Sequence, residues 1–297
     1  MKRLLLSLLL AAPALAQPLP APVPTAFTMP AAQQLEGTSL RRYAAAEADQ
    51  GVAVDERHFY AIDNSAIGKY RRDTGALVAR WASPRGGLVA HINSCTALDG
   101  TLVCANSNYP AIPMGSSVER IDTATMLPAE SHSLGLMDEG SLVWLVPQPQ
   151  GWLAGFAHYD RADGKGGVGY KDARYGNVVR LDAQFRRTGG WLFPEAVLAR
   201  MKPHAASGGA LGPDGLLYVL GHDRPELYVL AQPLMGPVLV HVATIAIEAP
   251  GQAFAFVPGS RDIMAISREA QQVVQISLPP VALAPVAGLA RPFPPGR

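Results

Sequence analysis

The chain has 297 residues, 48% of them hydrophobic, and a formal net charge of +1 at pH 7. This length and composition are sufficient for a single domain with a large core. The sequence contains no basic block and no basic stretch interleaved with aromatic residues, so it gives no electrostatic reason to expect a nucleic acid partner.

The first 16 residues have the pattern of a secretory signal peptide. Lys2 and Arg3 precede an apolar run at 4–12, and Ala14-Leu15-Ala16 supplies the small residues of a cleavage site. The run is too short to span a bilayer, and Pro13 disfavours the alternative of a buried N-terminal helix. Cleavage would remove two positive charges and leave a net charge of −1. We therefore expect a periplasmic or extracellular monomer without a membrane span.

Beyond the signal peptide, the composition divides the chain into three parts. Residues 17–37 are rich in Pro and Ala and are typical of a linker, and residues 280–297 form a Pro-rich tail. Between them, residues 38–279 carry a regular alternation of apolar runs and Gly, Pro or Asp turns. This middle part is the expected folded domain.

The folded domain repeats one pattern five times. In the first unit the expected strands are 52–55, 59–62, 67–71 and 77–81, separated by polar turns. No segment shows a sustained apolar period of 3.6 residues, which favours an all-β chain. Such a repeat predicts a β-propeller with four-stranded blades. The five units open at Gly51, Ile92, Ser141, Ser207 and Ala253.

Closure of the ring follows from a missing strand. The fifth unit lacks its fourth strand, while an isolated strand-like run at 38–44 precedes the first unit. We expect this N-terminal strand to join the last blade, which also hides an exposed sheet edge. The prediction is five blades; six is the alternative if the long third unit, 141–203, conceals an extra one.

The first unit also resembles a known group of proteins. Gly51-Val52-Ala53-Val54-Asp55, Phe59-Tyr60-Ala61-Ile62-Asp63-Asn64, Lys69-Tyr70 and Asp73-Thr74-Gly75 are similar to one blade of secreted bacterial propellers with NHL-type, YVTN-type or quinoprotein-like repeats. The chain also resembles exported propellers described as cycloisomerase-like. The resemblance covers about residues 38–279 and implies the propeller fold, whereas the fold alone does not imply an activity.

The two cysteines are placed for a cross-strand disulfide. Asp99-Gly100 is a typical two-residue hairpin turn, and counting outward from it sets Cys95 opposite Cys104 on a non-hydrogen-bonded pair. Export brings the pair into oxidising conditions. Two buried thiols or a metal pair are the alternatives, although no other cysteine is present to complete a thiolate metal site.

Strand direction predicts which face of the ring carries the site. Successive strands of a blade alternate, so the starts of first strands and the ends of second strands share one face. The unusual polar residues of the sequence fall at these positions, and loops at one mouth of a ring are where a ligand site is expected. The predicted ligand-binding residues are His91, Asn93, Asn106, Asn108, Tyr109, Tyr159, His204, Asp223 and Arg224, with His158 and His222 as predicted catalytic residues.

The chemistry of these residues leaves several interpretations open. Imidazoles from three blades are suited to a divalent metal or to acid–base catalysis. The alternative for each single imidazole is a hydrogen bond with a neighbouring loop carbonyl. The asparagines are ordinary turn formers as well as ligand-binding groups. A Gly-rich insertion at 163–176 is either a lid over the mouth or a surface loop.

We therefore carry three functional hypotheses. The first is a module that binds a small polar ligand or a partner's loop at the His- and Asn-rich face. The second is an enzyme, a lyase, isomerase or lactonase, in which His158 and His222 transfer protons and a divalent metal is an optional cofactor. The third is a scaffold that contacts protein partners through its outer strands.

Overall fold

The computed structural model describes residues 27–160 and 171–295. Residues 31–297 form the propeller unit, and residues 1–30 form a separate unit. The expected signal peptide, residues 1–16, and most of the Gly-rich insertion lie outside the described residues. Among the residues that are described, no helix is long and apolar enough to cross a membrane.

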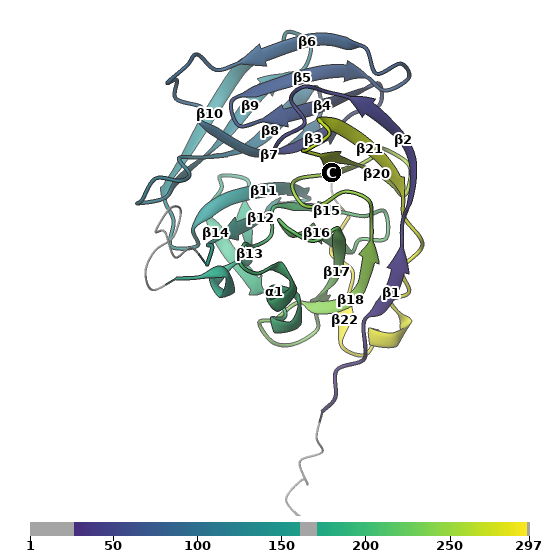
Figure 1. Ribbon diagram of the computed structural model, residues 1–297. Helices are drawn as coiled ribbons and strands as arrows, with labels where there is room; N and C mark the ends of the chain where they lie inside the picture. Colours follow the sequence, from purple (N-terminus) through teal and green to yellow (C-terminus); the bar gives the residue numbers. More distant parts are fainter. Residues whose placement is uncertain (1–26, 161–170, 296–297) are drawn as a thin grey trace, which may run out of the picture. The chain divides into compact units, whose positions relative to one another are not determined.

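The unit is a five-bladed β-propeller, as the sequence predicts (Figure 1). Each blade has four antiparallel strands, and the strand that opens its repeat unit is the innermost one. In the last blade the outermost strand comes from the N-terminal part of the chain. The first two blades are β3 (Gly51–Val54), β4 (His58–Asp63), β5 (Ala66–Arg71) and β6 (Leu77–Ala82), followed by β7 (His91–Leu98), β8 (Thr101–Ser107), β9 (Gly115–Asp122) and β10 (Leu127–Leu136).

The remaining blades continue the same order around the ring. They consist of β11 (Ser141–Gln148), β12 (Gly151–Ala157), β13 (Asn177–Asp182) and β14 (Arg187–Leu192); β15 (Gly208–Leu211), β16 (Leu217–Leu220), β17 (Glu226–Pro233) and β18 (Val240–Ala246); and β19 (Ala255–Phe256), β20 (Asp262–Ser267), β21 (Gln272–Ser277) and β2 (Thr38–Ala44).

The ring is closed in two ways. The inner strands contact one another in the order β3, β7, β11, β15, β19 and back to β3. The predicted N-terminal strand is β2, which pairs antiparallel with β21 from Thr38 opposite Ser277 to Ala44 opposite Gln272. The third unit contains four strands in the described residues and no additional blade, so the count is five rather than six.

The sequence pattern missed several short elements, including two single-turn 3-10 helices, η1 (Ala173–Tyr175) and η2 (Ala284–Val286). A seven-residue helix, α1 (Glu195–Met201), follows the third blade, and it is too short for an apolar period to emerge. β1 (Gln33–Glu36) pairs parallel with β18, and β22 (Ala290–Arg291) pairs with β17. The Pro-rich segments on either side of the repeats therefore add strands to the fourth blade.

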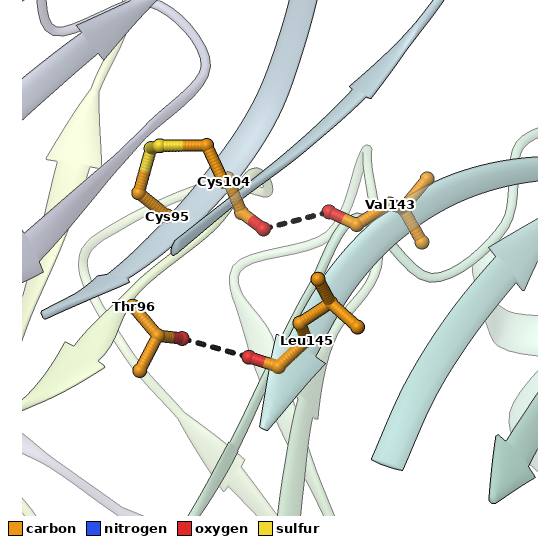
Figure 2. Close-up of a disulfide and its surroundings, with 6 residues drawn as sticks. Cys95, Thr96, Cys104, Val143 and Leu145 are labelled. Atoms are coloured by element: carbon orange, nitrogen blue, oxygen red, sulfur yellow. Dashed lines mark hydrogen bonds between the residues drawn. A yellow bond between two sulfur atoms is a disulfide. The ribbon is translucent and has the colours of Figure 1, made fainter. Parts of the chain in front are cut away.

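The second blade is braced at the predicted hairpin. Asp99 and Gly100 both have positive φ, and the register sets Cys95 opposite Cys104, which form the disulfide in Figure 2. On the inner strand β7, Thr96 Oγ1 donates to the carbonyl of Leu145 at 2.7 Å (Figure 2). Ser94 Oγ of the same strand donates to the carbonyl of Val143 at 2.8 Å. These bonds tie the second blade to the third.

Glycines allow the inner strands to approach closely near the axis. A Cβ on Gly208 would lie 2.7 Å from Ala253 Cα, and one on Gly209 would lie 2.6 Å from the ring of Trp144. Trp144 is 1% exposed. The indole therefore fills the contact between the third and fourth blades, which a side chain at Gly209 would obstruct, whereas Gly208 lets the fourth blade approach the fifth.

Candidate functional site

A cavity of about 480 Å³ lies where the inner strands begin. Its lining comes from all five blades, and nearly every lining residue precedes a first strand, follows a second strand or stands near such an end. This is the face that strand direction predicts. The lining consists of Asp49, Gln50, Asn64, Ala90, His91, Asn93, Tyr109, Pro110, Val143, Tyr159, His204, Ser207, His222, Gln252 and Arg268.

The most compact chemical group at the cavity is a carboxylate between two imidazoles. His204 Nδ1 lies 2.9 and 3.0 Å from the Asp223 carboxylate oxygens, and His222 Nδ1 lies 3.2 Å from Oδ1 of the same residue. The two imidazole rings are stacked with centroids 4.1 Å apart and planes 27° apart. One carboxylate thus holds both rings in place.

Gln252 contacts the second ring nitrogen of His222, whose first nitrogen faces Asp223. The Gln252 amide nitrogen lies 3.1 Å from His222 Nε2, and because an amide N–H only donates, Nε2 is the acceptor and the ring proton is on Nδ1. That proton is then donated to Asp223. Burial lowers the pKa of His222, and the neighbouring His204 lowers it further. His222 is therefore neutral at pH 7.

The backbone of Gln252 is unusual. Its φ is 71°, in the left-handed region that non-glycine residues rarely adopt, and its side chain is buried. The preceding Gly251 also has a positive φ, and a Cβ there would lie 2.0 Å from the carbonyl oxygen of His222. The loop before β19 is therefore pressed against the loop after β16, which brings the Gln252 amide to the imidazole.

Aromatic rings form an arc around one side of the cavity. His91 lies 5.0 Å from Tyr109, Tyr109 lies 5.7 Å from Tyr159, and Tyr159 lies 5.1 Å from His204, all measured between ring centroids. The Tyr159 ring is edge-on to both of its neighbours. This packing holds the side chains without filling the cavity.

The other side of the cavity is an ion pair with amides. Arg268 Nε donates to the Asp49 carboxylate at 2.9 Å and to the Asp49 carbonyl at 2.8 Å. Asn64 Nδ2 and Gln50 Nε2 donate to the other carboxylate oxygen at 3.1 and 3.2 Å. The cavity thus presents imidazoles on one side and a guanidinium, a carboxylate and amides on the other.

Two predicted residues act at the base of the cavity. Asn93 is buried and donates to the carbonyl of Leu142 at 2.8 Å, and it also donates to Ser107 Oγ at 3.3 Å. Asn106 donates to Ser117 Oγ at 2.9 Å and accepts from the backbone N–H of His91 at 3.3 Å. Burial lowers the pKa of His91, so this imidazole is also neutral at pH 7.

The structure brings most, but not all, of the predicted residues together. His91, Asn93, Tyr109, Tyr159, His204 and His222 line the cavity, and Asp223 and Asn106 support them. His158 is 3% exposed and does not line it, although burial lowers its pKa. Asn108 closes its own loop by bonding Pro113 and Gly115, and Arg224 bonds the carbonyl of Arg200.

Several polar cavity residues were absent from the predicted set, namely Asp49, Gln50, Asn64, Ser207, Gln252 and Arg268. Gln252 precedes the first strand of the fifth blade and Arg268 follows its second strand, so the same positional rule selects both. The eleven predicted residues come from the second, third and fourth blades only, so the prediction included neither Gln252 nor Arg268. Neither residue stands in a chemically suggestive motif, and position alone was the available signal.

A candidate metal group is also present. Among the residues that the structure describes, His204, His222 and Asp223 offer one ligand atom each, all within 4.8 Å of one another. Two imidazoles and a carboxylate suit a transition metal ion or proton transfer.

Comparisons with known proteins bear on the fold. No protein-family model matches the sequence, and no curated protein matches it. Among solved structures, glutaminyl cyclase of Myxococcus xanthus is similar with a TM-score of 0.55 at 9% identity, over 85% of this chain and 100% of that one. Hydrazine synthase of Kuenenia stuttgartiensis is similar with a TM-score of 0.43 at 15% identity, over 76% of this chain and 70% of that one.

At these identities the likeness concerns fold alone. The chain is a five-bladed propeller structurally like the Myxococcus cyclase, and no sequence family is established for it.

Proposed function

We propose that the chain binds a small polar ligand in the cavity at the start of the inner strands. The observation that carries this proposal is that hydrogen-bonding side chains from all five blades line one hollow of about 480 Å³. A few convergent polar groups in a concave site are the usual form of a small-molecule site. We also expect, from the N-terminal pattern, that binding takes place in the periplasm or outside the cell.

The backbone of Gln252 supports this proposal. A non-glycine residue in the left-handed region costs free energy, and such residues cluster at functional sites. Here the left-handed backbone conformation places the Gln252 amide in the cavity and against His222. Ser207 adds a further polar group, because its hydroxyl lines the cavity and has no hydrogen-bond partner among the described residues.

A second function, an enzyme with histidine acid–base groups, has its own support. Asp223 orients two imidazoles, and an imidazole held by a carboxylate is a common arrangement for proton transfer. If the chain is an enzyme, we propose His204 in place of His158 as the second acid–base group beside His222. The rings of His204 and His222 are stacked, and His158 does not line the cavity. The chemistry is then a lyase, isomerase or lactonase reaction, or the ring closure that the name of the Myxococcus protein indicates.

Thermal unfolding in the presence of small polar molecules tests the first proposal. The panel holds free amino acids, amides, sugars, small carboxylates and short peptides with N-terminal glutamine, and a ligand that binds the native state raises the unfolding temperature. We expect at least one class to do so in the wild type and not in the His91→Ala/Gln252→Ala variant.

His132→Ala is the matched control, because His132 is exposed on the outer strand β10 and does not line the cavity. A hit that stabilises the double variant as much as the wild type would place binding elsewhere and contradict the proposal. Turnover of a hit that disappears in His222→Ala would favour the enzyme over a binding module.

A further inference from the structure

We propose that His204, His222 and Asp223 form a site for one divalent transition metal ion of the zinc type, with its open coordination positions facing the cavity. This inference rests on the proposed function and deepens it, because a bound ion would supply a fixed positive charge for an anionic or carbonyl-bearing ligand.

Two of the three distances between the ligand atoms are close to those that such an ion needs, and the third is within 4.8 Å. In a tetrahedral site with bonds of about 2.0–2.1 Å, ligand atoms lie about 3.3 Å apart. The Nδ1 atoms of His204 and His222 lie 2.9 and 3.2 Å from the nearest Asp223 oxygen. Coordination would replace the two Nδ1 protons that these contacts now share with the carboxylate.

The donor set selects the class of ion. Two imidazole nitrogens and one carboxylate oxygen suit Zn²⁺, Fe²⁺ or Co²⁺, whereas Ca²⁺ and Mg²⁺ prefer oxygen ligands throughout. Three protein ligands also leave a position for water or substrate, as catalytic zinc sites do. Ser207, with its buried hydroxyl unpartnered among the described residues, lines the same cavity.

Gln252 provides an independent argument. A metal-bound imidazole almost always donates its second N–H to a neighbouring acceptor, which fixes the ring. The Gln252 amide already lies 3.1 Å from His222 Nε2, and rotating that amide by half a turn exchanges its nitrogen for its oxygen. In the metal-bound state Gln252 Oε1 would then accept a proton from Nε2, while Nδ1 binds the ion.

Binding of one ion by both imidazoles requires that one of the two rings rotate. The rings are stacked with planes 27° apart, so their Nδ1 lone pairs run side by side and do not meet at one point. The His204 side chain is 26% exposed, whereas His222 is fixed on both nitrogens. A rotation of His204 about its Cβ–Cγ bond would bring both lone pairs and the carboxylate to one ion.

Metal uptake by the full chain tests the inference. The protein is stripped with EDTA, dialysed and titrated with Zn²⁺ or Co²⁺, and bound metal is measured by elemental analysis. We expect one ion per chain, a loss of at least 100-fold in affinity in His222→Ala, and a loss of 10–100-fold in Gln252→Leu. The control His132→Ala should bind as the wild type does.

X-ray absorption at the zinc edge of the wild type covers the case in which a variant does not fold. Two imidazoles and at least one oxygen around the ion support the site, and one imidazole or none overturns it. Uptake by the wild type no greater than by His204→Ala/His222→Ala also overturns it. Ligand binding that persists in metal-free protein, together with no metal uptake, would overturn this inference alone and leave the proposed function intact.

Discussion

The two ends of the ring differ in how their polar side chains are arranged. At the end where first and second strands are joined by turns, Asp55 accepts a hydrogen bond from Tyr60 and Asp214 accepts one from Tyr218, each within its own blade. At the opposite end, imidazoles, tyrosine rings, amides and an ion pair face one cavity, and together they come from all five blades. Polar pairs that are completed within a blade, or between two neighbouring blades as Asp214 and Arg261 are, support the fold, whereas polar groups that converge on one cavity from all five blades indicate a site.

Cavity size does not make this distinction. The turn end also has a cavity, of about 620 Å³, which is larger than the one at the polar end. Its lining includes Phe254, Phe256 and Phe293 together with glycine and proline turns. The smaller cavity has the chemistry of a ligand site, so chemistry and not volume identifies the candidate.

The largest expected effect comes from the indole between the two ends. Trp144 is 1% exposed and packs against Gly155 and Gly209. Trp144→Ala should lower the free energy of unfolding by about 3–5 kcal/mol, because it leaves a cavity in the close-packed inner ring. Denaturant unfolding measures this, and a loss below about 1 kcal/mol would show that the inner strands do not depend on the indole.

Removal of the disulfide should act on one end only. Cys95 lines the cavity at the turn end, and the bridge closes a short hairpin. Cys95→Ala/Cys104→Ala should destabilise the chain by about 2 kcal/mol, and reducing agent should destabilise the wild type but not the variant. Ligand binding at the polar end should be unchanged; a parallel loss of binding would mean that the two ends are coupled.

A pair of substitutions separates stability from binding. Tyr218→Phe removes a 2.8 Å hydrogen bond to Asp214, which keeps its contacts with Arg261, and should cost about 1.5 kcal/mol without affecting a ligand. Gln252→Ala should abolish ligand binding with a smaller loss of stability. Unfolding and binding are measured on both variants, and the reverse pattern would invert the assignment of the two ends.

The smallest expected effect is a pH dependence at the turn end. Burial raises the pKa of the Asp55 carboxyl, but hydrogen bonds from Tyr60 and from the backbone N–H of Arg57 and His58 outweigh it and hold the pKa below its ordinary value of 3.8. Because the folded-state pKa is the lower one, this stabilisation is present above about pH 4 and is lost as the pH falls further. Unfolding curves of wild type and Asp55→Asn should therefore converge below pH 4, and curves that stay parallel would exclude this role.

The sequence was most informative about the fold, because each blade repeats local signals. The run at 38–44 became β2, and the turn at Asp99-Gly100 set Cys95 opposite Cys104. β1 and α1 were missed because each is too short to show a pattern and depends on packing against neighbouring elements.

The sequence predicted which face of the ring carries the cavity, but not which side chains contact one another there. Strand direction placed His91, His204 and His222 on one face of the ring, and all three line the cavity at that face. It did not distinguish His158, one residue before Tyr159, although neighbouring residues of an extended chain point in opposite directions. The approach of Gln252 to His222 depends on a left-handed backbone between two distant loops, which no local pattern encodes.

A crystal structure of the chain with a ligand from the screen tests the central claim most directly. The account predicts ligand density in the cavity that His222, Tyr159 and Arg268 line. Density in the cavity at the turn end, beside Phe256 and Phe293, or on the outer strands of the blades would contradict it.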